Sequence, residues 1–391
     1  MYSRRPCICV VYVCALAVGL SWADSNTSAS LSSREWPKLL RQAEHGDHNA
    51  QRRVGLAYKH GEGVRQDFVE ALKWFSEAAK QADPVAESNL GLMYYLGQGV
   101  ERNFSAAVEW FESAASHGLP EAQFNAGYLY ESGIGVRQNL GRAFHLYREA
   151  AEKGFAPAQN NLAQMYENGE GIARDPVAAV KWYTKSAMQG DRRAQFNLGV
   201  LYCNGTGIPR DYGKAAEWAE RAAKQGYAHA QTALGNFYLG GWGVRQDDHL
   251  AAFWLQQGAS QGDSTAQTKL GLLYLSGRGV PHDDVVAAMW LSKAAEQNQH
   301  EAQAKLALLY ESGRGVPRDL NRAYFWGLLS RDGETVSQYE QIRNLSLHMA
   351  DNDVAAVEHL ASEWRLTHAA KAPAELESFP LADPAVAETV Q

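Results

Sequence analysis

Residues 194–202 read AQFNLGVLY and are followed by Gly205-Thr206-Gly207. The alanine that opens this stretch recurs every 36 positions, and the tyrosine that closes it recurs with it. The alanines are Ala50, Ala86, Ala122, Ala158, Ala194, Ala230, Ala266 and Ala302. An unbroken period of roughly 20–50 residues marks a solenoid, in which each unit buries its apolar face against its neighbours. The sequence therefore predicts one structural unit copied eight times, which together present a long surface.

Each unit has the pattern of a helical hairpin. In the first unit Ala50, Val54 and Tyr58 lie at helical spacing, and apolar residues within 71–79 form a second helical stripe. Between them, the Gly-x-Gly at 61–63 supplies two residues that adopt positive φ without strain. We expect these glycines to end the first helix and turn the chain back.

The second helix of each unit has a recognisable start. Its entry position holds only aspartate or asparagine, which are the strongest N-capping residues. They are Asp67, Asn103, Asn139, Asp175, Asp211, Asp247, Asp283 and Asp319. A position that repeats in the register of the fold serves the repeat, so these residues are predicted to be caps and not a catalytic or metal-binding series.

Seven tryptophans occupy one position of the second helix, with Leu146 as the exception. They are Trp74, Trp110, Trp182, Trp218, Trp254, Trp290 and Trp326. Pairs of alanines such as Ala78-Ala79 follow one turn later and allow neighbouring helices to approach closely. Large side chains that face small ones predict a packed core rather than a stack of rings for a ligand.

The following residues define the unit most clearly: the run AQFNLGVLY at 194–202, then Gly205, Gly207, Asp211, Ala215 and Trp218. This pattern resembles the Sel-one-like repeat (SLR) family, a relative of the tetratricopeptide repeat, over residues 50–330. The resemblance implies an all-α, right-handed α-solenoid of helical hairpins. It also implies a scaffold or adaptor that binds other proteins. One branch of the family joins its repeats by cysteine pairs, and this sequence departs from that branch.

The two ends of the chain differ from the repeats. Arg4 and Arg5, an apolar run from Cys7 to Leu20, and small residues around Ala23 predict a secretory signal peptide. A retained membrane anchor and a twin-arginine signal are the alternatives. The expected divisions are a signal peptide at 1–23, a flexible leader at 24–33, an N-terminal capping half-repeat at 34–49, eight repeats at 50–330, C-terminal capping helices at 331–366 and a disordered tail at 367–391.

Composition narrows the classes of partner. Loss of the signal peptide would leave 35 basic and 44 acidic residues, a balance that disfavours nucleic acid and anionic membranes as partners. Cys203 would be the one remaining cysteine, so no intramolecular disulfide is expected. We expect Cys203 to be a small, partly buried side chain, with an intermolecular disulfide as the alternative.

The sequence carries no pattern that predicts a reaction. It has no nucleophile elbow, no phosphate-binding glycine loop and no metalloprotease helix motif. His45 and His48 lie close together but lack a third ligand, and His282 precedes the expected cap Asp283. We therefore expect no enzymatic activity, no metal and no cofactor.

The candidate binding residues lie on the first helix, on the side away from its core stripe. In related solenoids this side lines the concave groove. Asparagine amides can pair with a peptide backbone, and aromatic rings can anchor a partner. The predicted partner-binding residues are Asn89, Tyr95, Phe124, Asn125, Tyr128, Asn161, Phe196 and Asn197. The alternative is that the asparagines brace successive hairpins.

Together these observations predict an exported, monomeric scaffold that binds a peptide or protein in a concave groove. The expected location is the periplasm of a Gram-negative bacterium or the medium, and the alternative is the lumen of a eukaryotic secretory pathway. Two other functions stay open: a structural envelope component that assembles through its edges, and a cell-wall-active enzyme. No integral membrane segment is expected after signal cleavage.

Overall fold

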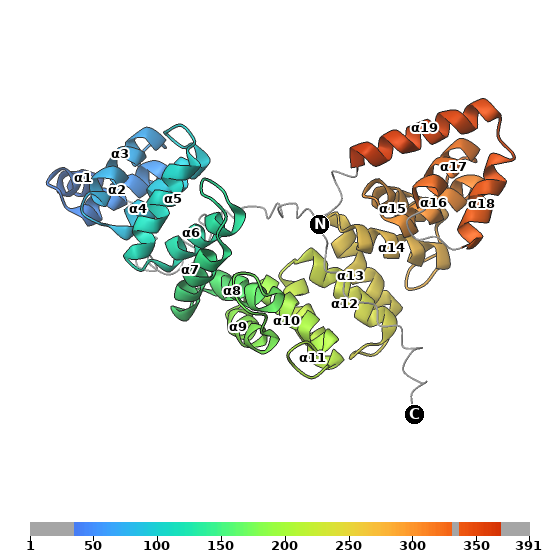
Figure 1. Ribbon diagram of the computed structural model, residues 1–391, viewed down its shortest axis with the longest axis horizontal. Helices are drawn as coiled ribbons and strands as arrows, with labels where there is room; N and C mark the ends of the chain where they lie inside the picture. Colours follow the sequence, from blue (N-terminus) through green and yellow to red (C-terminus); the bar gives the residue numbers. More distant parts are fainter. Residues whose placement is uncertain (1–34, 331–335, 369–391) are drawn as a thin grey trace. The chain divides into compact units, whose positions relative to one another are not determined.

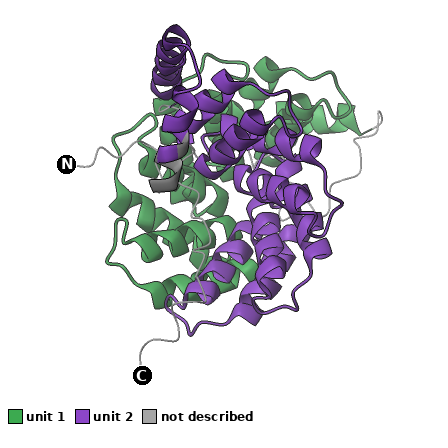
Figure 2. Cartoon of the chain, turned by 90° about the vertical axis from the view of Figure 1, so that its right-hand side faces the viewer, with its two compact units in different colours: residues 1–189 green, residues 190–391 purple. Residues whose placement is uncertain are grey.

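The computed structural model describes residues 35–330 and 336–368. The chain divides into two compact units, residues 1–189 (unit 1) and residues 190–391 (unit 2) (Figures 1 and 2). The helices of unit 1 are α1 (Trp36–Glu44), α2 (His48–His60), α3 (Phe68–Ala79), α4 (Pro84–Leu96), α5 (Phe104–Ser116), α6 (Pro120–Ser132), α7 (Leu140–Glu152), α8 (Ala156–Asn168) and α9 (Pro176–Met188). Those of unit 2 are α10 (Arg192–Asn204), α11 (Tyr212–Lys224), α12 (Ala228–Gly240), α13 (Asp248–Ser260), α14 (Ser264–Ser276), α15 (Asp284–Glu296), α16 (His300–Ser312), α17 (Leu320–Leu329), α18 (Val336–Ser346) and α19 (Asp351–His368).

The described residues contain helices and turns but no strand, which confirms the predicted all-α fold. Each repeat contributes one hairpin, made of an even-numbered first helix and an odd-numbered second helix from α2 to α17. Within each unit, helices pack chiefly against their neighbours in the chain, so the hairpins stack as a solenoid. Among the described helices, none combines the length and the apolar composition that a membrane crossing requires.

The predicted helix ends are confirmed. Every second helix begins after the expected aspartate or asparagine, whose side chain accepts a backbone N–H of the first turn. Gly97 ends α4 with φ +72°. Gly99 has φ +70°, and a Cβ there would lie 2.4 Å from the backbone oxygen of Phe68. The second glycine of the pair therefore also lets the loop lie against the start of the preceding second helix.

The core depends on one glycine in the first helix of most repeats. A Cβ on Gly91 would lie 2.9 Å from the ring of Phe111, and one on Gly127 would lie equally close to the ring of Tyr147. The missing side chain lets the ring from the second helix lie flat on the first helix. Phe111 and Tyr147 are buried as a result, and they pack the two helices of the hairpin together.

The tryptophans lie at the boundary between repeats, where the sequence places them, but they are less buried than expected. Trp110 packs against the apolar cluster shared by α3 and α4. Only Trp290 of the seven is buried, at 7% exposed, and the others are half-buried. The side chain of Arg221 covers the ring of Trp218 at 4.3 Å from its centroid. The fully buried position is the one that follows the tryptophan.

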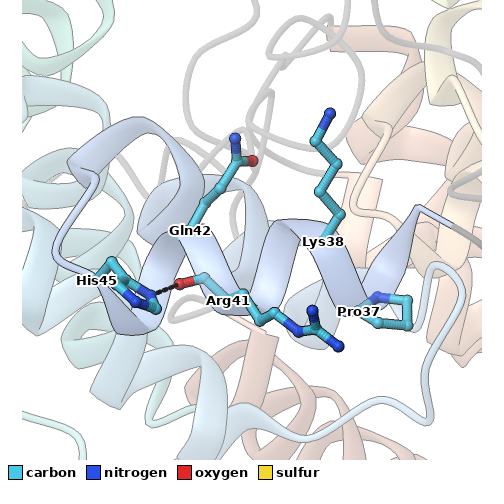
Figure 3. Close-up of a pocket in the computed structure, with 5 residues that line it drawn as sticks. All are labelled: Pro37, Lys38, Arg41, Gln42 and His45. Carbon is cyan, nitrogen blue, oxygen red and sulfur yellow. Dashed lines mark hydrogen bonds between the residues drawn. The ribbon is translucent and has the colours of Figure 1, made fainter.

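The predicted signal peptide at 1–23, the leader at 24–33 and residues 369–391 of the tail lie outside the described residues. At the N-terminal end, α1 packs on α2. Five residues in and next to α1 line a shallow pocket of about 470 Å³ on its surface: Pro37, Lys38, Arg41, Gln42 and His45 (Figure 3). Lys38 and Gln42 lie 36 positions before Trp74 and Ala78, so polar groups replace the residues that join one repeat to the next. A polar outer face suits a terminal cap.

At the other end, α18 and α19 pack against α17. The helix α19 extends to His368, two residues beyond the expected boundary at 366. Between α17 and α19 lies a groove of about 780 Å³, whose walls include Phe325, Leu360, Trp364 and Leu366. This end is thus more apolar than the end formed by α1.

Candidate protein-binding surface

The first helices of unit 1 place polar side chains at two repeated positions. Register positions count from the repeat alanine, so +9 holds Lys59, Tyr95, Glu131 and Glu167, and +3 holds Asn89, Asn125 and Asn161. These seven residues are called the polar row. A residue at +9 and the residue at +3 of the next repeat are separated by 30 positions, and the pairs are Lys59 with Asn89, Tyr95 with Asn125, and Glu131 with Asn161.

The first pair of the polar row is directly bonded. Lys59 Nζ donates a hydrogen bond of 2.7 Å to Asn89 Oδ1. Asn89 Nδ2 in turn donates to the backbone oxygen of Val85 at 2.8 Å. Both ends of the Asn89 amide are therefore occupied, and Asn89 braces α4 against α2, as the alternative interpretation of the asparagines proposed. Burial lowers the pKa of Lys59 from 10.5 to about 8.

The third pair is connected through a buried tyrosine. Tyr147 of α7 donates its hydroxyl to Glu131 Oε2 at 2.5 Å and also hydrogen-bonds Asn161. Burial, and then the neighbouring Glu131, raise the pKa of Tyr147 well above its usual value. Burial also raises the pKa of Glu131, while the hydrogen bond from Tyr147 acts in the opposite direction. Tyr183 repeats the arrangement one repeat later, where its hydroxyl donates a hydrogen bond of 2.9 Å to Glu167 Oε2.

The second pair, Tyr95 and Asn125, is different. Both side chains are half-buried, and neither makes a side-chain hydrogen bond among the described residues. The ring of Tyr95 packs on Phe104 with centroids 5.2 Å apart, which fixes its position. Tyr128 lies within electrostatic range of both Tyr95 and Tyr147. The centre of the polar row thus offers a hydroxyl and an amide that the fold does not use.

Two of the predicted aromatic anchors, Phe124 and Phe196, pack between repeats. Phe196 is only 8% exposed, so the expectation that its ring is exposed is wrong. Its ring packs on Tyr227 at 5.4 Å, and the half-buried Phe124 packs on Phe155 at 5.5 Å. Each partner precedes the first helix of the next repeat, and this contact is not visible on the wheel of a single helix. Arg52 uses the same position for an ion pair of 2.8 Å with Asp83.

Phe196 and Asn197 belong to unit 2, whereas the polar row lies in unit 1. In unit 2 the +9 position holds Cys203, Leu239, Leu275 and Glu311. Cys203 is buried, more fully than the partly buried side chain that the sequence led us to expect, and burial raises the pKa of its thiol, which disfavours the reactive thiolate. The prediction that Asn197 binds a partner stays a prediction.

The brace that recurs through the repeats is a glutamine that sequence reasoning missed. Gln159, one residue after the repeat alanine, donates to the backbone oxygen of Ala151 at 3.0 Å and accepts from Gln189 at 2.7 Å. Six other repeats have glutamine at this position, and the second repeat has Glu87. The sequence contained the signal for this brace, because the glutamine recurs every 36 residues. Because these buried amides already join neighbouring hairpins, the free amide of Asn125 is not needed as a brace.

The histidines considered as ligands have structural partners. His48 Nδ1 lies 3.1 Å from Asp83 Oδ2, and His45 Nδ1 contacts the backbone oxygen of Arg41 at 2.6 Å (Figure 3). Within residues 35–330 and 336–368, no three His, Cys, Asp or Glu side chains are grouped so that they could hold a metal ion.

Comparison with known proteins gives a consistent result. Eight consecutive segments match the family model described as the Sel1 repeat: 48–83, 84–119, 120–155, 156–191, 192–227, 228–263, 264–299 and 300–330. A Sel1 repeat protein from Oxalobacter formigenes is similar in structure, with 30% identity, a TM-score of 0.60, and coverage of 79% of this chain and 90% of that chain. So is c5321, a protective antigen present in uropathogenic Escherichia coli strains that displays an SLR fold; identity is 29%, the TM-score is 0.56, and coverage is 88% of this chain and 81% of that chain. No curated protein matches this chain.

Proposed function

The chain belongs to the Sel1 repeat family, and we propose that it is an exported, non-enzymatic scaffold that binds an extended segment of a partner protein through the polar row of unit 1. The observation that carries this proposal is the unused pair at the centre of the row, Tyr95 and Asn125. An asparagine amide matches both hydrogen-bonding groups of a peptide backbone. A tyrosine held by Phe104 supplies contact area with little loss of conformational freedom.

Peptide selection tests this proposal. A synthetic library of random peptides with free C-termini is panned on the mature chain, and the affinity of the selected peptide is measured by calorimetry. Truncation of interface anchors commonly costs about 2 kcal/mol or more, which is roughly a thirtyfold loss of affinity. We expect Tyr95→Phe with Asn125→Ala to cause such a loss while the thermal midpoint stays nearly unchanged.

Unit 2 provides the matched control. Leu239 and Lys269 occupy the same two register positions and are also separated by 30 residues. Leu239→Ala with Lys269→Ala should leave the affinity unchanged. Equal losses in both double variants, or no selected peptide at all, would refute binding through the polar row.

Export is proposed from the sequence of residues 1–23, with the periplasm or the medium as the destination. N-terminal sequencing of the recovered protein tests it, because cleavage after Ala23 gives a chain that begins at Asp24. A cytosolic protein that retains Met1 would overturn this part of the proposal.

Assembly through the ends of the chain is the second candidate function. It is favoured by the groove between α17 and α19, where Leu360 is 54% and Leu366 is 79% exposed. Exposed apolar side chains beside a groove are typical of association surfaces. Light scattering during size-exclusion chromatography distinguishes the two: a scaffold with one binding face runs as a monomer, whereas end-to-end assembly increases the mass with concentration.

A further inference from the structure

Lys59 is a buried cation without a counter-charge among the described residues. Its side chain is 8% exposed, and Nζ donates to the neutral Asn89 Oδ1 at 2.7 Å. The described residues place no carboxylate within ion-pair distance of Nζ. An ammonium carries three N–H donors, and Asn89 accepts one of them. The positive charge and the other donors are thus left without an acidic partner in the fold.

Burial of an unpaired charge is costly, and proteins normally pair such charges. Burial lowers the pKa of Lys59 to about 8, so the amine is still largely protonated at neutral pH. The residue lies in the last turn of α2, where the helix dipole favours a cation. The helix dipole would favour an exposed lysine in the last turn equally well, so it does not explain why Lys59 is buried.

The other repeats show that the fold does not need a cation at this position. The equivalents of Lys59 are Tyr95, Glu131, Glu167, Cys203, Leu239, Leu275 and Glu311. They are aromatic, acidic or apolar, yet their hairpins have the same helix ends and the same glycine pairs. The unpaired ammonium is therefore a departure of the first repeat, at one end of the polar row.

From this we infer that Lys59, held by Asn89, is the subsite for a carboxylate of the bound segment, either an acidic side chain or the C-terminal carboxylate. The inference rests on the proposed function, since it places the acidic group of the peptide next to the Tyr95 and Asn125 pair. Arg53 lies at +3 on the same helix, is exposed, and adds positive charge near this end of the row. Arg52 is already paired with Asp83 and is not available.

Three versions of the selected peptide test the inference. One is unchanged, one has each Asp and Glu replaced by Asn and Gln, and one has an amidated C-terminus. Loss of the bound carboxylate should weaken binding to the wild-type chain by about tenfold, the scale of a partly buried charge pair. The version that loses affinity identifies whether the carboxylate is a side chain or the C-terminus.

The variant Lys59→Met makes the test specific. In this variant the carboxylate-free peptides should bind as well as the unchanged peptide, whereas Lys269→Met in unit 2 should retain the wild-type preference. If removal of both kinds of carboxylate leaves wild-type affinity unchanged, or weakens Lys59→Met equally, the inference is overturned while the proposed function stands. If the library yields no peptide, the proposed function fails and the inference fails with it.

A second readout does not depend on affinity. The pKa of Lys59, followed by the carbon shift of its ε-methylene group in NMR, should rise from about 8 when the peptide binds, because a nearby carboxylate favours the charged amine. An unchanged pKa at saturating peptide would contradict a carboxylate at Lys59.

Discussion

The first-helix faces of the two units have the same backbone pattern and different chemistry. In unit 1 the +9 position carries Lys59, Tyr95, Glu131 and Glu167, whereas in unit 2 it carries Cys203, Leu239, Leu275 and Glu311. In both units the first helices end at a glycine in the left-handed region and the second helices begin at an aspartate or asparagine cap. The fold therefore tolerates polar and apolar side chains at this position.

The difference teaches where to look for function in a repeat protein. Positions that are constant in all repeats are accounted for by helix ends, close packing or bracing. Positions that vary without a change of backbone are free to carry binding groups, and in unit 1 they carry hydrogen-bonding and charged groups. Their internal bonds, such as Tyr147 to Glu131, hold the ends of the row and leave Tyr95 and Asn125 unused.

The largest expected effect concerns the fully buried residue of the second helix that packs against the first helix in both units. Tyr147 and Leu255 occupy the same fully buried position in the two units. Tyr147→Ala and Leu255→Ala should each cost about 3–5 kcal/mol of unfolding free energy, since both leave a cavity. Trp218→Ala removes a half-buried ring and should cost about 2 kcal/mol. Urea denaturation followed by circular dichroism measures the loss of unfolding free energy in all three variants. A loss in Trp218→Ala as large as that in Tyr147→Ala would show that the tryptophans form the main core.

The next effect concerns the buried charge of Lys59, which the first-helix face of unit 2 lacks at the same position. Because the pKa of Lys59 is lowered from 10.5 to about 8, the stability of the wild-type chain should rise as the pH increases from about 8 towards 10.5, by at most about 3 kcal/mol. Below pH 8 the cost of the buried charge is fully present. Lys59→Met should show no such rise, and Lys269→Met should keep it. Denaturation midpoints at pH 7 and 9.5 give the answer; parallel behaviour of wild type and Lys59→Met would mean that Lys59 is not the cause.

A smaller effect concerns the acidic part of the polar row. Tyr147→Phe leaves the half-buried Glu131 without its hydroxyl donor and should cost about 1–3 kcal/mol at neutral pH. The pKa of Glu131 is raised above 4.5, so its contribution to stability falls as the pH rises from 4.5 through the folded-state pKa. Loss of the donor raises that pKa further.

The cost of Tyr147→Phe should accordingly be smaller at pH 4.5 than at pH 7, where the carboxylate is charged. In a Glu131→Gln background the cost should no longer depend on pH. Urea titrations at the two pH values, with and without Glu131→Gln, decide the matter, and a pH-independent cost in the wild-type background would exclude Glu131 as its origin.

The smallest expected effect compares the turns between hairpins. Ala82 in unit 1 has φ +57°, and Asn298 in unit 2 has φ +65°, where most other repeats have glycine. The left-handed conformation costs alanine about 1 kcal/mol and costs asparagine less. Ala82→Gly should therefore raise the thermal midpoint more than Asn298→Gly does. The reverse order in a melting experiment would show that strain at Ala82 is not significant.

The hairpins, caps and glycine turns could be predicted because each depends on residues close in sequence and repeated in register. Phe196 could not be placed correctly, because its ring is covered by Tyr227 of the next repeat and a single helical wheel contains no information about neighbours. Lys59 and Glu131 were overlooked because their significance lies in partners 30 and 16 residues away. The +9 register contained these residues, but only the contacts reveal which groups remain unused.

Hydrogen–deuterium exchange tests the central claim most directly, because it maps binding on the intact chain. The wild-type protein is measured with and without the selected peptide, and exchange is compared in α4 and α6 of unit 1 and in α12 and α14 of unit 2. Binding through the polar row predicts added protection in residues 84–132 and none in residues 228–276. Protection confined to the helices of unit 2 would contradict it.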